Sequence, residues 1–218
     1  MRGDRISTAL LCRQLIPNAD AALLAQLAVP EGHRSLGILT TDCDDASYAA
    51  LDEATKKAAV RVAYARSMYA GAGNASTRLA GEFIGILAGE NPADVRSGME
   101  AAVRFIREEA SFISANGDDS IVYFAHCISR TGTYLSGEAG VPAGTAMAYL
   151  IAPPAEAVVA LDAALKAAEV ELRLFYGPPT ETNFAGGLLT GDQAACQAAC
   201  AAFAGKVCQM ADHPIQGR

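Results

Sequence analysis

The feature that most constrains the fold of this chain is an internal repeat. Three segments of the first half recur in the second half in the same order: residues 29–32 as 141–144, 51–60 as 161–170, and 86–90 as 188–192. The offset between matching segments drifts from 112 to 102 residues, as loops of different length would produce. Alanine-rich helices could give one such match by chance, but three in order indicate a duplicated unit. We predict two domains, residues 1–110 and 111–218, each a copy of one fold.

Composition supports a folded protein and argues against several functions. Hydrophobic residues make up 51% of the 218 residues and charged residues 19%, so a sizeable core can form. The formal net charge is −7 and no cluster of lysine and arginine occurs, which argues against nucleic acid as a partner. No apolar stretch approaches the roughly 20 residues that span a bilayer, and the N-terminus lacks the pattern of an export signal. We expect a cytosolic protein with no membrane partner.

The six cysteines are expected to be thiols that pack in the core or at an interface. Cys196 and Cys200 are four residues apart and would share one helix face, where they could hold a metal. No Cys-x-x-Cys pair and no histidine at ligand spacing accompanies them, so no metal site is predicted.

Hydrophobic patterns predict the same elements in both copies. Runs of strand length occur at residues 35–40, 60–64 and 82–88, and again at 147–152, 170–176 and 185–190. Apolar residues at helical spacing occur at residues 92–107 and 193–210.

A further helix is expected after the first of these strands in each copy. Residues that can begin a helix follow both strands, namely Asp44, Asp45 and Ser47 in copy one and Pro153 and Pro154 in copy two. Residues 19–27 and 129–140 fill equivalent positions at the front of each copy. The order strand, short element, strand, helix, strand, strand, helix predicts an α+β fold with mostly antiparallel pairing.

Copy two resembles the domain of bacterial microcompartment shell proteins. The similarity rests on a helix that ends Asp-Ala-x-x-Lys-Ala-Ala-x-Val and on a later strand that ends in Gly-Asp before an alanine-rich helix. The matching residues are Asp162, Ala163, Lys166, Ala167, Ala168, Val170, Gly191 and Asp192. The strand before the Val-Pro-x-Gly segment makes the order resemble the circularly permuted, tandem-domain version, a ferredoxin-like fold. Nearly the whole chain is similar to the ethanolamine-utilisation subgroup of these proteins.

This resemblance implies a structural protein and not an enzyme. It implies a homotrimer that forms a flat pseudohexagonal tile, joins other shell proteins in a microcompartment of the bacterial cytoplasm, and carries a gated pore on its threefold axis. A ring of this kind closes through heterologous contacts. Residues 71–74 and 129–137 are candidate mobile segments near the pore. A corrinoid is a further partner associated with such proteins, although no motif assigns a site for it, and no cofactor is predicted.

The resemblance also implies a lysine at the edge where tiles meet. This position corresponds to Lys166 and, through the repeat, to Lys56. The alternative is that each is an ordinary solvated lysine of a helix.

Catalytic motifs do not occur in the sequence. The three histidines, His33, His126 and His213, are far apart and outside any recognisable motif. The chain also lacks a nucleophile elbow, a Walker loop and a dinucleotide-binding glycine motif. No catalytic residue is therefore predicted.

Acidic residues beside the strands are the clearest candidate site. Asp42, Asp44 and Asp45 follow the strand at residues 35–40, and Glu82 begins another strand. Carboxylates and an aromatic face together suit a small ammonium ligand. The resemblance places an ethanolamine site on Asp44, Asp45, Glu82, Phe112, Thr182, Asn183 and Phe184. Alternatively, Asp44 and Asp45 only cap the helix that follows, and one of them can cap while the other binds.

Two other functions remain open from the sequence. The chain could be a tandem shell protein of another catabolic microcompartment, whose small pores need not recognise an amine. It could also be a ligand-binding enzyme or regulator with a repeated ferredoxin-like domain.

Overall fold

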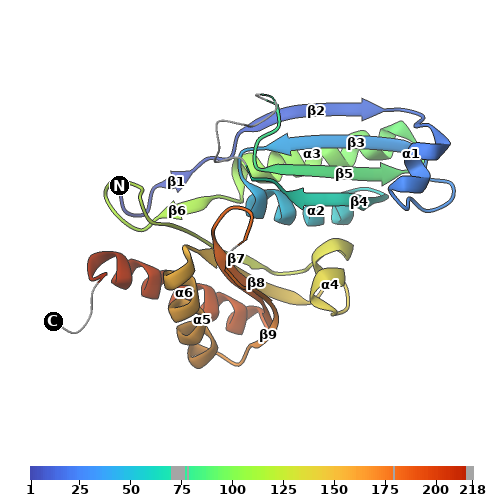
Figure 1. Ribbon diagram of the computed structural model, residues 1–218. Helices are drawn as coiled ribbons and strands as arrows, with labels where there is room; N and C mark the ends of the chain where they lie inside the picture. Colours follow the sequence, from blue (N-terminus) through green and yellow to red (C-terminus); the bar gives the residue numbers. More distant parts are fainter. Residues whose placement is uncertain (70–76, 78, 179, 215–218) are drawn as a thin grey trace. The chain divides into compact units, whose positions relative to one another are not determined.

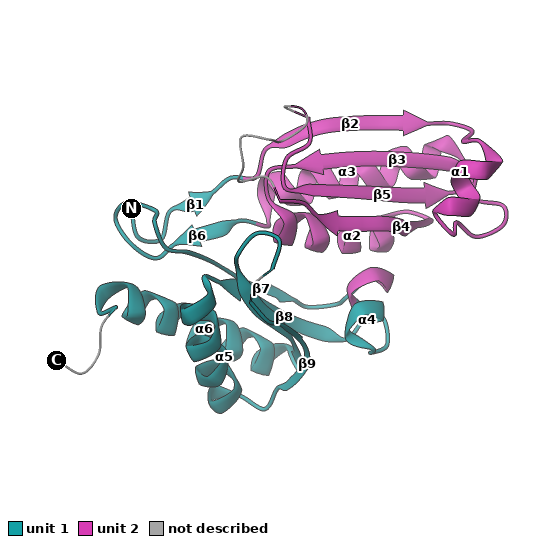
Figure 2. Ribbon diagram, in the orientation of Figure 1, with its two compact units in different colours: residues 1–7, 111–131, 136–218 teal, residues 8–110, 132–135 magenta. Residues whose placement is uncertain are grey.

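The computed structural model describes residues 1–69, 77, 79–178 and 180–214. These residues form two compact units (Figures 1 and 2). Unit 2 comprises residues 8–110 and 132–135, and unit 1 comprises residues 1–7, 111–131 and 136–218. The sequence halves 1–110 and 111–218 differ from these units in two short stretches, residues 1–7 and 132–135.

Unit 2 is a four-stranded antiparallel sheet covered on one face by two helices (Figure 1). The strands lie in the order β2 (Leu10–Ile16), β3 (Ser35–Thr41), β5 (Phe83–Gly89) and β4 (Val60–Ser67). The helices α2 (Asp44–Lys57) and α3 (Pro92–Glu108) pack on each other and on the sheet, and α1 (Ala21–Gln26) lies between β2 and β3 in sequence. The Oδ1 atom of Asn91 caps α3 by accepting hydrogen bonds from the N–H groups of Ala93 and Asp94, each with a donor–acceptor distance of 3.0 Å.

Unit 1 is a six-stranded sheet with two helices packed against it. The strand order is β1 (Arg5–Ile6), β6 (Phe112–Ser114), β7 (Val122–Ile128), β8 (Ala146–Ala152), β10 (Ala185–Gly191) and β9 (Glu171–Tyr176). Its helices are α5 (Pro154–Ala167) and α6 (Gln193–Asp212), while α4 (Thr133–Ala139) lies between β7 and β8 in sequence. The side chain of Asp192 caps α6 by accepting the N–H of Ala195 over 2.7 Å.

The predicted duplication is confirmed in the order of the elements and of the strands. The sheet order β2-β3-β5-β4 of unit 2 recurs as β7-β8-β10-β9 in unit 1. The segments that follow α2 and α5 also match. The Val60 N–H donates to the Ala58 carbonyl and the Val170 N–H donates to the Ala168 carbonyl, each with a donor–acceptor distance of 2.9 Å. Leu51 and Leu161, equivalent residues of the two helices, are both buried.

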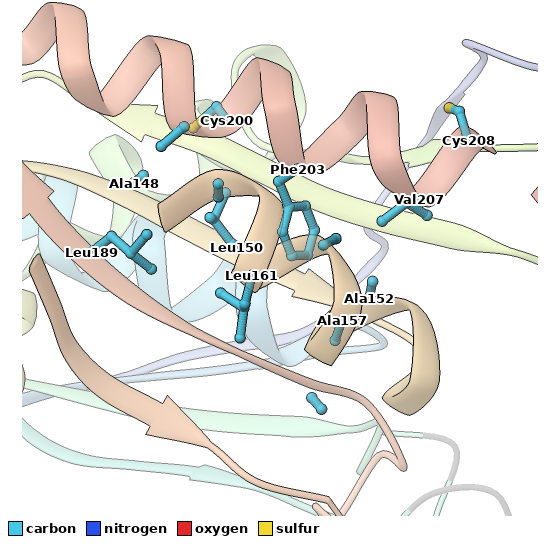
Figure 3. Close-up of a cluster of buried hydrophobic side chains, with 14 of the residues drawn as sticks. Ala148, Leu150, Ala152, Ala157, Leu161, Leu189, Cys200, Phe203, Val207 and Cys208 are labelled. Atoms are coloured by element: carbon cyan, nitrogen blue, oxygen red, sulfur yellow. The ribbon is translucent and has the colours of Figure 1, made fainter. Parts of the chain in front are cut away.

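The core of unit 1 consists largely of small side chains around a few large ones (Figure 3). Phe203 of α6 is fully buried and lies in one cluster with Leu150 of β8, Leu161 of α5 and Leu189 of β10. Alanine and cysteine surround them, which lets α5 and α6 approach the sheet closely. None of the helices in the described part of the chain is long and apolar enough to cross a membrane.

Two short strands, one at the front of each copy, were not predicted. The strands β1 and β6 pair with each other, with Arg5 opposite Ile113, and so extend the sheet of unit 1. They have only two and three residues, too few for a hydrophobic period to reveal. Of the two candidate mobile segments, residues 71–74 lie outside the described residues, and residues 133–137 of the other belong to α4.

We predict that Phe203→Ala destabilises the protein by about 3–5 kcal/mol, because it removes a buried ring and leaves a cavity. Denaturant unfolding followed by circular dichroism measures the change. Phe175→Ala is the matched control, since Phe175 is 50% exposed, and its cost should be far smaller. Equal losses for the two variants would contradict the packing described here.

Candidate functional site

Carboxylates gather at one end of the sheet of unit 2, where strand pairing brings distant residues together. Thr41, the last residue of β3, pairs with Phe83, the first residue of β5. The N–H of Glu82 donates to the Thr41 carbonyl over 2.8 Å. Glu82 therefore lies beside the residues that follow β3. We call the following set the acidic cluster: Asp42, Asp44, Asp45 and Glu82.

Asp44 and Asp45 occupy the first turn of α2, and both are only 7% exposed. Cys43 at the N-cap makes no side-chain capping bond. Instead, Asp44 Oδ1 accepts the N–H of Asp45 over 2.9 Å, and the positive end of the helix dipole favours both carboxylates. The position of both residues in the first turn of α2 fits the predicted capping role.

Burial and like charge act together on the acidic cluster. Burial raises the pKa of the Asp44 carboxyl, against hydrogen bonds from Ser67 and the Asp45 N–H that lower it. Burial also raises the pKa of Glu82, and the negative charges of Asp44 and Asp42 raise it further. The charged groups that act on Glu82 are thus carboxylates, and a cation placed among them would relieve their repulsion.

A tyrosine completes the polar surroundings of Asp44. The hydroxyls of Tyr48 and Ser67 are 2.9 Å apart. Either hydroxyl can be the donor of this bond, and a hydrogen bond from Ser67 opposes the rise in the pKa of Asp44. The Tyr48 ring packs edge-on against Phe83 at 4.9 Å between centroids. Helical spacing from Asp44 could have predicted Tyr48, whereas Ser67 depends on the pairing of β4 with β5.

The aromatic residues of the predicted site come together at the corresponding end of the sheet of unit 1. Phe112 is 5.5 Å from Phe184 between ring centroids, in an edge-on arrangement. The loop before β10 is held by Thr180, whose Oγ1 accepts the Phe184 N–H over 3.1 Å and donates to the Phe184 carbonyl over 2.8 Å. Asn183 is exposed and has a φ of +61°, a left-handed conformation that asparagine tolerates. Thr182 is half-buried.

The seven predicted residues therefore fall into two groups, one in each unit, and one residue of each group holds an equivalent position. Glu82 directly precedes β5, and Phe184 directly precedes β10, the equivalent strand of the other copy. One copy carries carboxylates at this end of its sheet, and the other carries aromatic rings. Within each unit the structure brings the predicted residues together, and their union into one ligand site stays a prediction.

The two predicted edge lysines lie in the last turns of α2 and α5. Lys166 Nζ is 2.7 Å from Asp162 Oδ2, and its side chain is 74% exposed. Lys56 pairs with Glu53, and its side chain is only 25% exposed. Lys166 is thus the more exposed of the two.

The described residues contain no group of three or more histidine, cysteine, aspartate or glutamate side chains that could hold a metal ion. All six cysteines are free thiols. Burial raises the pKa of Cys196 to about 11 and that of Cys200 to about 12, so neither is a ready thiolate at neutral pH. The ring of His126 stacks on Phe124 at 5.5 Å between centroids, a packing role.

Comparison with known proteins places the chain in a family. A model described as "BMC domain" matches residues 35–117. The "Bacterial microcompartment shell protein EutL" of Clostridium perfringens (strain 13 / Type A) is 59% identical over 99% of both chains. The chain belongs to the EutL family of bacterial microcompartment shell proteins. Its Escherichia coli (strain K12) relative of the same name is 46% identical over 98% of this chain and 97% of that one.

The EutL fold extends over the whole chain. The crystal structure of the ethanolamine utilization protein EutL from Leptotrichia buccalis C-1013-b superposes with a TM-score of 0.97 at 64% identity and covers 100% of each chain. The domain match begins at Ser35, the first residue of β3, and leaves out β2 and α1. Such an incomplete match is expected when the order of the elements is circularly permuted. EutL proteins are structural components of a shell and not enzymes.

We predict that Glu82→Gln stabilises the protein near pH 7. The raised pKa of Glu82 means that the folded state binds a proton more tightly than the unfolded chain, so the ionised carboxylate costs stability above the folded-state pKa. The gain should shrink as the pH falls through that pKa toward about 4.3, the ordinary value of glutamate.

Thermal unfolding midpoints at several pH values test this prediction. Glu31→Gln, at an exposed position of the same unit, is the control and should change the midpoint little. A loss of stability near pH 7, or a gain that persists unchanged at low pH, would count against the electrostatic account.

Proposed function

We propose that this protein forms a homotrimeric tile in the shell of an ethanolamine-utilisation microcompartment in the bacterial cytoplasm. Small pores of the tile bind ethanolamine at Asp44, Asp45, Glu82, Phe112, Thr182, Asn183 and Phe184. A gated central pore then controls the passage of metabolites and cofactors. The observation that carries the ligand is the acidic cluster, where Glu82 stands among other carboxylates at a half-buried position.

The chemistry of the acidic cluster supports an ammonium ligand. Ethanolamine is a cation with a hydroxyl at its other end, and charge-assisted hydrogen bonds to carboxylates are strong when water is partly excluded. A ring face adds about 0.5–2 kcal/mol for a cation, and Phe112 and Phe184 are the rings of the second group. Thr182 and Asn183 supply polar groups for the hydroxyl.

The family supports the identity of the ligand. The relative from Leptotrichia buccalis is described as an ethanolamine utilization protein, and it is 64% identical to this chain. A compartment that degrades ethanolamine needs a route for it through the shell. A site that recognises ethanolamine within the tile is therefore a suitable place to sense it.

Occupancy of the site would favour the closed form of the central pore. Without a ligand, Glu82 and the neighbouring carboxylates repel one another, so the empty site is held loosely. A bound cation removes this repulsion and orders the end of the sheet. Ethanolamine can shift the gate only through such a difference in affinity between the two states.

We predict that the double variant Asp45→Asn with Glu82→Gln weakens ethanolamine binding at least tenfold, about 1.4 kcal/mol. The change removes two charges while keeping the shape of both side chains. Isothermal calorimetry at low salt measures the affinity. The control is Glu31→Gln with Glu169→Gln, two exposed positions that lose the same charge.

Ligand analogues sharpen this experiment. Propanol lacks the ammonium and should not bind, whereas ethylammonium lacks the hydroxyl and should bind weakly. Undiminished binding of ethanolamine to the double variant would place the ligand elsewhere and remove the basis for the gating proposal.

We also predict that Lys166→Ala leaves trimers intact but abolishes the assembly of tiles into sheets. The side chain is exposed at the end of α5 and can reach a neighbouring tile. Sedimentation reports the trimer, and negative-stain electron microscopy reports the sheets. Lys206→Ala on α6 is the control, and sheets that form normally from Lys166→Ala would show that the edge lies elsewhere.

A further inference from the structure

The repeat-related helices α2 and α5 differ in what covers one of their faces. On α2 this face carries Tyr48, Asp52 and Thr55, spaced as neighbours along one side of a helix. Asp52 is completely buried. A buried carboxylate requires partners, so something must be packed over this face.

The cover of the α2 face is a short segment, residues 132–135, which groups with unit 2. Asp52 accepts the N–H of Gly132 over 2.6 Å and the N–H of Leu135 over 2.9 Å. The Thr133 N–H donates to Thr55 Oγ1 over 3.0 Å. The side chain of Leu135, 1% exposed, is buried in this arrangement.

The same face of α5 is open to solvent within the chain. The residues equivalent to Tyr48, Asp52 and Thr55 are Val158, Asp162 and Leu165, at the offset of 110. Val158 is 49% exposed and Leu165 is 37% exposed. The Asp162 side chain is 62% exposed. Two apolar side chains on a helix thus lack the cover that their counterparts have.

The repeat also identifies what the missing cover should be. Gly132 directly precedes α4, and residues 133–135 are the first residues of that helix. The equivalent helix of copy one is α1, because each of the two helices lies before a Val-Pro-x-Gly segment, at an offset of 112. This offset aligns Thr133 with Ala21, the first residues of the two helices, and Leu135 with Leu23. Leu23 is 43% exposed, and α1 contains no buried residue.

We propose that α1 of one copy of this protein packs on the exposed face of α5 of a second copy. The contact repeats, between chains, the one that residues 132–135 make with α2. It is a head-to-tail contact, since the two surfaces differ, and such contacts close into a ring when repeated. This inference rests on the proposed homotrimer and identifies the surfaces that hold it together.

The two contacts are equivalent but not identical. Asp52 serves as the helix cap for residues 132–135, whereas α1 carries its own cap, because Asp20 accepts the N–H of Ala22 over 2.8 Å. Asp162 is accordingly not needed as a cap and pairs with Lys166. A Cβ at Gly132 would overlap Thr55 Oγ1 and the Asp52 carbonyl. The equivalent Asp20 has a Cβ, so α1 approaches α5 less closely and the contact is mainly apolar.

Sedimentation of the full chain tests the surfaces. Leu23→Glu and Leu165→Glu should each convert the trimer into the 22.5 kDa single chain while circular dichroism stays unchanged. Leu172→Glu, at a leucine of β9 that is 36% exposed, is the matched control and should stay trimeric. Variants that remain trimeric at both Leu23 and Leu165 would overturn the proposed contact.

Cross-linking tests the direction of the contact without breaking it. Ala22 and Val158 are the counterparts of Tyr134 and Tyr48, whose rings stack at 6.2 Å. Chains carrying Ala22→Cys and chains carrying Val158→Cys, co-expressed with different tags, should be joined by a short bismaleimide. Either variant alone should give no more product than the unmodified protein with its six cysteines. Ala22→Cys with Gln197→Cys, on the exposed side of α6, is the control and should not react.

The outcomes separate this inference from the proposed function. A wild-type protein that does not self-associate would refute both the trimer and the contact. A wild-type trimer that shows no cross-link between Ala22→Cys and Val158→Cys, or a cross-link of either variant with itself, would refute the contact alone.

Discussion

The pairing of the two central strands in each sheet, β3 with β5 and β8 with β10, is the constraint on which the other features depend. This register places the residue before β5 beside the residues that follow β3, and the residue before β10 beside those that follow β8. Glu82 reaches the first turn of α2 by this route, and Phe184 occupies the equivalent position in the other copy. A slip of one residue would turn every side chain of the strand to the opposite face and disperse both groups.

The acidic cluster is costly for a chain of this kind to maintain. Asp44 and Asp45 are almost completely buried, and the charges that act on Glu82 are other carboxylates. The N-terminus of α2 and the hydrogen bond from Ser67 stabilise the Asp44 carboxylate. Glu82 has no comparable support among the causes of its pKa shift. This imbalance is the physical basis of the proposal that a cation binds at the acidic cluster.

Duplication followed by divergence explains why the two copies differ where they do. The cores keep the same strand order, since both must bury the same helix pair on the same sheet. The faces of α2 and α5 are free to differ, because residues 132–135 cover only the first of them. The chain therefore carries one completed contact and one pair of open surfaces, α1 and the face around Val158 and Leu165. These open surfaces are the ones that the proposed contact between copies would cover.

The sequence by itself determined the duplication, the order of the main strands and helices, and the positions where α2 and α5 begin, because these depend on local periodicity and short segments. It also indicated the carboxylates near β3 and Glu82. Tertiary structure alone decided that Ser67 joins Asp44, that β1 pairs with β6, and that Asp52 is buried while Asp162 is exposed. These features depend on strand register and on segments distant in sequence, which no local pattern records. Asp52 and Asp162 occupy the same place in the repeat, and only the packing of residues 132–135 makes them different.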